Sequence, residues 1–270
     1  MSRINPQKRL GQVFLKNKKY LEKIIKAGEI SQNDIILEIG AGSGVLTEAL
    51  LQTGAKIVAI EKDPQLVKFL QEKFKNHKNL TIIGADIRDF LKNKSFYTKY
   101  KIQNTEYKVV GNIPYYLTSH LLRLLLELEK KPQIIVLMIQ KEVAQRIIAQ
   151  PPKMNLLAVS VQFFAKPEII AYVPKSAFWP QPKVDSAIIK LTPIHTDMNT
   201  DKQWIDIFFR ILKAGFSQPR KLLISNLQKT LKIEKNKIID AILKINIPLN
   251  SRSQNLSLKD WQNLTNLLLS

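Results

Sequence analysis

Short apolar segments alternate with helical segments over the first two-thirds of the chain, and this alternation restricts the fold more than any other sequence feature. The first five apolar segments are nearly continuous, which is typical of strands buried on both faces of a parallel sheet. Two later segments have no long helix between them and predict an antiparallel edge. The predicted strands are Asp34–Ile39, Lys56–Ile60, Leu80–Ala85, Tyr107–Val110, Gln133–Ile139, Glu168–Val173 and Ala187–Leu191.

Helical patterns lie between these strands and also fill the end of the chain. Together with the strands they indicate a doubly wound α/β fold with a mostly parallel sheet. The polar segment Pro193–Thr200 ends the β pattern, so we predict an α/β domain over residues 1–193 and a small all-helical domain over residues 200–270. The predicted helices are Val45–Gln52, Pro64–Asn76, Thr118–Glu129, Glu142–Ala149, Lys202–Ala214, Arg220–Leu231, Lys235–Ile245 and Leu258–Leu269.

The chain is strongly basic, with 42 Lys and Arg against 22 Asp and Glu and a net charge of +20. Eight of these basic residues lie in the first 28 positions, and twelve lie in residues 195–270 against six acidic ones. Such a surplus favours nucleic acid as the partner, with an anionic membrane second and an evenly basic surface as the alternative without a partner.

Several classes of protein are excluded or disfavoured by what the sequence lacks. It contains no cysteine, which excludes disulfides, thiolate metal sites and cysteine nucleophiles. Its three histidines are far apart, so we predict no metal site. It has neither an apolar run of the roughly 18 residues that a membrane helix needs nor a secretory signal, and we expect a cytoplasmic protein.

A glycine-rich segment, Glu38–Gly44 (EIGAGSG), follows the first predicted strand. Gly40 and Gly42 would let the backbone turn tightly and approach a ligand at the carboxyl end of the strand. A dinucleotide-binding G-x-G-x-x-G motif would need glycine at position 45, where the chain has Val45. The spacing instead fits the loop of methyltransferases that use S-adenosylmethionine, and a turn without a ligand remains the alternative.

Two carboxylates end the next two predicted strands. Glu61 is placed to accept hydrogen bonds from both hydroxyls of a ribose, and Asp86 to accept one from the exocyclic amine of an adenine. Each is also consistent with an acid that is merely solvated at the end of its strand. Their order after the glycine loop favours a nucleoside ligand.

The fourth predicted strand ends in Gly111-Asn-Ile-Pro-Tyr-Tyr116, at the same edge of the sheet. The side-chain oxygen of Asn112 and the carbonyl of Ile113 could accept the two N–H bonds of an adenine amine and localise its lone pair. Pro114 would stiffen the turn, and Tyr115 would stack on the base. The alternative is a strand-ending turn with core tyrosines, and we expect Tyr116 to serve packing.

With these motifs, the chain resembles the ribosomal RNA adenine N6-dimethyltransferases, which use S-adenosylmethionine and have a Rossmann-like fold. The resemblance covers nearly the whole chain. It rests on Gly11–Leu15 (GQVFL), Glu38–Gly44, Gly111–Tyr116, Phe178–Ile188 (FWPQPKVDSAI) and Gly215–Leu227 (GFSQPRKLLISNL).

The resemblance implies roles for further residues. Leu15 and its neighbours would fold over the cofactor, whose pocket Gly40, Glu61, Asp86 and Asn112 would line. Phe178 would stack on the target base opposite Tyr115. Val13 stands where the family usually has Asn or His, so a polar side-chain contact is lost there, although a main-chain contact can survive.

Two branches of this family share the motifs. The segment Gln218–Leu227 resembles the branch that dimethylates two adjacent adenosines in a hairpin near the 3′ end of small-subunit (16S) ribosomal RNA during ribosome assembly. The alternatives are the resistance enzyme that modifies large-subunit RNA, and a non-enzymatic assembly or transcription factor on the same fold. The implied partners are ribosomal RNA, the small ribosomal subunit or its precursor, and we expect a monomer.

Overall fold

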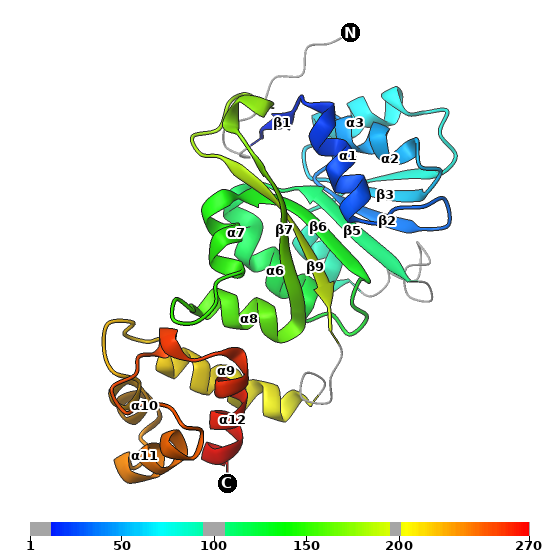
Figure 1. Ribbon diagram of the computed structural model, residues 1–270. Helices are drawn as coiled ribbons and strands as arrows, with labels where there is room; N and C mark the ends of the chain where they lie inside the picture. The colour runs from blue at the N-terminus through cyan, green and yellow to red at the C-terminus, as the bar shows by residue number, and fades with distance from the viewer. Residues whose placement is uncertain (1–11, 94–105, 195–200, 270) are drawn as a thin grey trace. The chain divides into compact units, whose positions relative to one another are not determined.

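The computed structural model describes residues 12–93, 106–194 and 201–269, and its chain forms two compact units (Figure 1). One unit comprises Met1–Ala144 and Pro167–Pro193, and the other comprises Gln145–Lys166 and Ile194–Ser270. The basic arm before residue 12 and the linker residues 195–200 lie outside the described residues. Among the helices that are described, none has the length and apolar character needed to span a bilayer.

The first unit is built on a seven-stranded sheet with the order β4-β3-β2-β5-β6-β9-β7. The five strands from β4 to β6 are parallel, and β9 pairs antiparallel with β6, which confirms the predicted fold class and antiparallel edge. The strands are β2 Ile35–Ile39, β3 Lys56–Glu61, β4 Leu80–Gly84, β5 Tyr107–Asn112, β6 Ile134–Gln140, β7 Ala165–Val173 and β9 Ser186–Pro193.

The register of the parallel strands brings their carboxyl ends together. Ile39 is opposite Ile60 on one side and Gly111 on the other, while Glu61 is opposite Gly84. The loops that leave β2, β3, β4 and β5 therefore start at one edge of the sheet. This edge is where ligands bind in open α/β sheets.

Helices cover the sheet. The helices of this unit are α1 Lys18–Ala27, α2 Val45–Leu51, α3 Pro64–Lys73, α4 Ile87–Lys92 and α6 Thr118–Leu126, and α7 Lys141–Ile147 follows β6. Apolar residues of α1, α2 and α3 form one core cluster with Ile36, Ile57 and Val110 of the strands. Because the intervening strand residues Leu37 and Val109 are also fully buried, both faces of the sheet are covered.

A second, two-stranded sheet joins two distant segments of the same unit. In it β1 (Phe14–Leu15) pairs antiparallel with β8 (Phe178–Trp179), and the main-chain N–H of Lys16 donates to the carbonyl of Ala177 at 2.9 Å. Short 3-10 turns precede the pair at Lys175–Ala177 and follow β5 at Tyr115–Leu117. The sequence did not predict this pairing, since two-residue strands carry no periodic signal.

The second unit contains α8 (Leu156–Phe164) and the four predicted C-terminal helices, which are α9 Lys202–Gly215, α10 Leu223–Leu231, α11 Lys235–Lys244 and α12 Leu258–Leu269. Phe163 of α8 stacks on Phe208 and Trp204 of α9, with ring centroids 4.6 and 5.9 Å apart. The predicted boundary near residue 193 assigned α8 to the first domain. Its sequence LLAVSVQFF is apolar except for Ser160 and Gln162, so periodicity predicts neither the helix nor its partner.

Candidate active site

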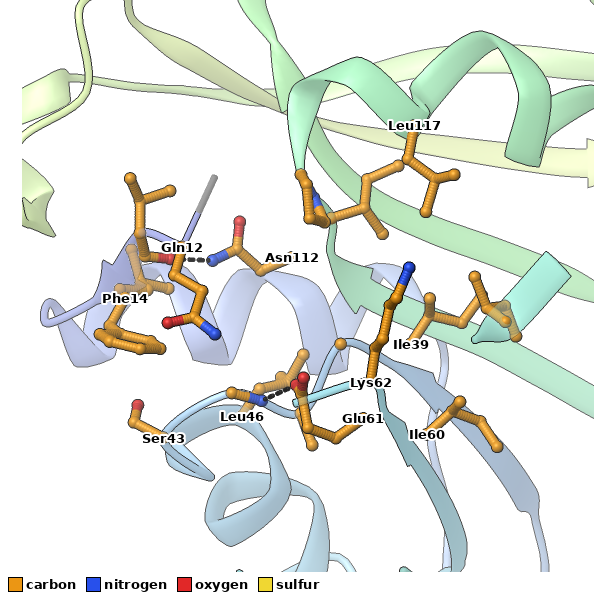
Figure 2. A pocket seen from close by; sticks show the side chains of 18 of the residues that line it. Gln12, Phe14, Ile39, Ser43, Leu46, Ile60, Glu61, Lys62, Asn112 and Leu117 are labelled. Carbon is orange, nitrogen blue, oxygen red and sulfur yellow. Dashed lines mark hydrogen bonds between the residues drawn. The ribbon is translucent and has the colours of Figure 1, made fainter. Parts of the chain in front are cut away.

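One pocket lies at the carboxyl edge of the sheet, within the first unit (Figure 2). It is formed by the loops after β2, β3, β4 and β5 together with residues 12–15 of the arm. The sequence-predicted residues that line it are Val13, Leu15, Gly40, Gly42, Glu61, Asp86, Asn112, Ile113 and Pro114. The structure therefore brings together all the residues that were predicted to bind a cofactor, and three of the five assigned to the acceptor site.

The glycine loop has a backbone that side chains would strain. Gly40, Gly42 and Gly44 have φ angles of 73°, 59° and 76°, in the left-handed region that favours glycine. The N–H of Gly40 donates to the carbonyl of Ile60 at 2.8 Å, which ties the loop to β3. A Cβ at Gly44 would also lie 2.7 Å from the ring of Phe74. The loop is thus held against β3, and its conformation and close packing favour glycine at these positions.

Glu61 lies at the end of β3, and its side chain is held by main-chain donors. Its Oε2 accepts from the N–H of Gly42 at 2.9 Å and its Oε1 from the N–H of Asp63 at 2.8 Å. Burial raises the pKa of Glu61, while these hydrogen bonds act in the opposite direction. Each carboxylate oxygen can accept a second hydrogen bond. Glu61 therefore fits a ligand with two neighbouring hydroxyls, as a ribose has.

Asp86 caps the N-terminus of α4 and lies among cations. Its Oδ2 accepts from Lys62 Nζ at 2.9 Å and from Arg88 Nη2 at 2.6 Å. Its Oδ1 accepts from Nε and from the main-chain N–H of Arg88, at 2.9 and 3.0 Å. Hydrogen bonding to Arg88 holds the pKa of Asp86 well below its usual range, so the group is ionised.

Asn112 ends β5, and the arm fixes the orientation of its side chain. Its Nδ2 donates to the main-chain carbonyl of Val13 at 3.0 Å, as Figure 2 shows. Because the amide nitrogen is engaged by the arm, the side-chain oxygen is the group left to accept from a ligand. The contact comes from the backbone of residue 13, so it does not depend on the Asn or His that the family usually has there.

Two further contacts hold the arm over the pocket. Gln12 Nε2 donates to Asp63 Oδ2 at 2.9 Å, and the ring of Phe14 stacks on Trp179 with centroids 6.5 Å apart. Leu15 is buried and opposite Phe178 in the β1–β8 pair. Residues 12–15 are therefore anchored on both the β3 side and the β8 side of the pocket.

The predicted base-stacking residues lie outside the lining of this pocket. The hydroxyl of Tyr115 is 2.8 Å from Ser186 Oγ, and Phe178 is 2% exposed and paired with Leu15 of the arm. Tyr116 differs from the prediction, because its side chain lines the pocket and is 65% exposed rather than packed. The chain enters a 3-10 helix at Tyr115, and with this turn Tyr116 rather than Tyr115 lines the pocket. Sequence alone does not show this.

Three further residues line the pocket but were not predicted from the sequence: Gln12, Lys62 and Arg88. Lys62 directly follows Glu61, and Arg88 is two residues after Asp86. The proximity of Lys62 and Arg88 to two predicted site acids could have indicated that they lie at the pocket. A basic residue beside an acid on the surface of a basic protein is common, however, and does not by itself indicate a site.

Comparison with known proteins shows which family has this architecture. The model of one family, described as ribosomal RNA adenine dimethylase, matches residues 3–269 of the chain. The chain belongs to that family. The resemblance predicted from the sequence motifs is therefore confirmed, and the chain is an rRNA adenine dimethyltransferase.

Individual relatives agree with this assignment. A protein of Dehalococcoides mccartyi named ribosomal RNA small subunit methyltransferase A is 38% identical over 97% of this chain and 88% of its own length. A Nostoc protein of the same name is 37% identical over 98% of both chains. These names favour the small-subunit branch over the large-subunit alternative.

Solved structures show the same fold. A dimethyladenosine transferase from Plasmodium falciparum superposes with a TM-score of 0.76 at 28% identity, covering 93% of this chain and 95% of its own. The 23S rRNA methyltransferase ErmE superposes with a TM-score of 0.71 at 23% identity, covering 95% of this chain and 100% of its own. At that identity the likeness to ErmE concerns the fold alone.

Proposed function

We propose that this enzyme transfers methyl groups from S-adenosylmethionine to N6 of two adjacent adenosines in a hairpin near the 3′ end of small-subunit ribosomal RNA. The product would be N6,N6-dimethyladenosine, formed in the cytoplasm on the small subunit or its precursor. The observation that carries the proposal is the hydrogen bond from Asn112 to the arm, which leaves an amide oxygen to accept from an amine at the pocket.

The residues present fit the proposed methyl donor. Glu61 has acceptor capacity for two ribose hydroxyls, and Asp86 is an ionised acceptor one strand further along the same edge. The glycine loop after β2, the neighbour of β3 on the side away from β4, brings the main chain close to the pocket without side chains. When bound, S-adenosylmethionine supplies a methyl group that is already activated by its sulfonium charge.

The enzyme's own contribution is then the activation and positioning of the acceptor amine. The lone pair of an adenine amine is delocalised into the ring, which makes it a poor nucleophile. The oxygen of Asn112 and the carbonyl of Ile113 would accept its two N–H bonds and favour a tetrahedral nitrogen. Pro114 holds this turn. Stacking of the target base on Tyr115 and Phe178 stays a prediction from the sequence and the family resemblance, because neither ring lines this pocket and Phe178 is 2% exposed.

No general base is required before transfer. The alkylated amine is cationic and loses its proton readily to water, so the residues around Asn112 need only orient and polarise. The same arrangement serves both additions, because the monomethylated amine still carries one N–H bond for Asn112 or Ile113 to accept. The target base must leave its stack to reach the pocket, which costs less in a loop than in a paired stem.

Mass analysis of ribosomal RNA from cells lacking this protein tests the proposal. We expect two neighbouring dimethyladenosines to be absent from small-subunit RNA and to return with the purified enzyme and S-adenosylmethionine. Loss of a methyl group from large-subunit RNA would support the resistance-type alternative instead. Unchanged RNA, together with no binding of S-adenosylmethionine by calorimetry, would support a non-enzymatic factor.

A further inference from the structure

The acceptor capacity of Asp86 is fully used in this structure. A carboxylate offers about four lone-pair positions. Four donors occupy them: Arg88 through its main-chain N–H, Nε and Nη2, and Lys62 through Nζ. Any further donor that binds Asp86 has to displace one of these four.

The four donors are not equally easy to displace. The main-chain N–H of Arg88 belongs to the first turn of α4, and its bond to Asp86 is the helix cap. The two side chains are free to leave, because those of Arg88 and Lys62 are already 40% and 52% exposed. Arg88 contacts both carboxylate oxygens, whereas Lys62 contacts only one. Arg88 is therefore the main competitor for the acceptor positions.

We propose that Arg88 is an affinity-determining latch, which occupies Asp86 in the free enzyme and is displaced by the exocyclic amine of the cofactor's adenine. This inference rests on the proposed function, in which Asp86 accepts from that amine. The free enzyme gives up an ion pair at the rim of the pocket when the ligand binds. The guanidinium moves into solvent, so each binding event exchanges one donor on Asp86 for another.

The latch makes a prediction of unusual sign: removing a residue that lines the pocket strengthens binding. A partly exposed ion pair stabilises the free enzyme only modestly, so the gain in affinity when it is removed is also modest. Arg88→Ala should lower the Kd of S-adenosylhomocysteine and of adenosine by about three- to tenfold. Lys62→Ala should act in the same direction with a smaller factor, since Lys62 fills one position. Isothermal titration calorimetry measures each constant.

Purine riboside, which lacks the exocyclic amine, tests whether the effect of Arg88 on binding depends on that amine. It cannot donate to Asp86, so its Kd should be the same in the wild type and in Arg88→Ala. All three ligands carry no net charge, and the two nucleosides differ only in the amine. A general change in the field or shape of the pocket would therefore move both nucleosides equally. The Kd ratio of purine riboside to adenosine is expected to rise by the same three- to tenfold factor.

Arg123→Ala serves as the matched control, because Arg123 of α6 pairs with Glu127 just after that helix and does not line the pocket. It should leave all constants unchanged, and thermal unfolding checks that each variant is folded. Weaker adenosine binding in Arg88→Ala, or an equal shift for both nucleosides, would overturn the latch while leaving the proposed function intact. If the wild type binds neither adenosine nor S-adenosylhomocysteine, the proposed function fails and the latch with it.

Discussion

The two ends of the pocket hold their key side chains in opposite ways. At one end, the amide of Asn112 is oriented by a main-chain carbonyl of the arm, and the adjacent Ile113 is 1% exposed. At the other end, Asp86 is held mainly by the exposed side chains of Arg88 and Lys62. The first end is fixed by the fold, and the second is held by groups that exchange easily.

The difference follows from what each end has to do under the proposed function. An acceptor that shapes an amine must already be in place when the methyl group is transferred, because reorganisation at that moment would add to the barrier. A recognition group has only to bind and release a ligand, and an exchangeable ion pair suits that task. Substitutions at the two ends should therefore affect different measured quantities.

The largest effect is expected at the fixed end. Asn112→Ala should reduce methyl transfer by about a hundredfold or more, the typical cost of removing one well-placed acceptor or donor of this kind. The protein should remain folded, and its affinity for S-adenosylhomocysteine should fall far less than its turnover. Single-turnover methylation at saturating cofactor, beside calorimetry, separates the two. Turnover equal to the wild type would remove Asn112 from the chemistry.

A second prediction concerns a carboxyl group that is fully buried, unlike the partly buried Asp86. Glu38 is fully buried before the glycine loop; its Oε2 accepts from Thr47 Oγ1 at 2.7 Å, and within the described chain no hydrogen bond reaches its Oε1. Burial raises the pKa of Glu38 from 4.5 to about 7. The neutral form is therefore favoured by folding, and the free energy of unfolding should fall as pH rises from 4.5 through about 7.

The variant Glu38→Gln cannot ionise and should lose this part of the pH dependence. The wild type is expected to lose as much as about 3 kcal/mol over that interval relative to the variant. Urea unfolding at pH 5 and pH 8 gives the change in the free energy of unfolding with pH for each protein. Comparing these two changes cancels any pH-independent effect of the substitution on stability. The same change of unfolding free energy with pH in both proteins would show that Glu38 stays ionised in the fold.

At the exchangeable end, the expected effect is smaller and concerns binding. Asp86→Ala should weaken S-adenosylhomocysteine binding by about tenfold, the scale of one hydrogen bond to a charged group. Turnover at saturating cofactor should stay close to the wild type. A drop in turnover as large as that of Asn112→Ala would show that both ends take part in the chemistry.

The smallest effect distinguishes the two neighbouring tyrosines. Tyr115→Phe removes the hydroxyl that contacts Ser186, and it should lower the free energy of unfolding by about 1 kcal/mol while methyl transfer changes little. Tyr116→Phe is the matched control, since that side chain is 65% exposed and should not alter stability. Equal stability of the two variants would show that the Ser186 contact contributes nothing.

Much of this site was predictable because it depends on local order along the chain. Apolar strands that alternate with helices define a parallel sheet, and a parallel sheet aligns the carboxyl ends of its strands. The glycine loop, Glu61, Asp86 and Asn112 each follow a strand, so their common position follows from sequence. The C-terminal helices were likewise predictable from their periodicity, as α12 was found at its predicted bounds.

Other features were decided only by tertiary structure, because they depend on contacts between distant or unpatterned segments. The arm contacts Asn112 across 99 positions of the chain through a main-chain carbonyl, and such a contact leaves no signal in the residue types. The turn after β5 determines that Tyr116 rather than Tyr115 lines the pocket. The grouping of α8 with the helical unit depends on aromatic packing that a mostly apolar segment does not specify. Sequence order thus determined which residues gather at the sheet edge, and the folded contacts determined how each one is held there.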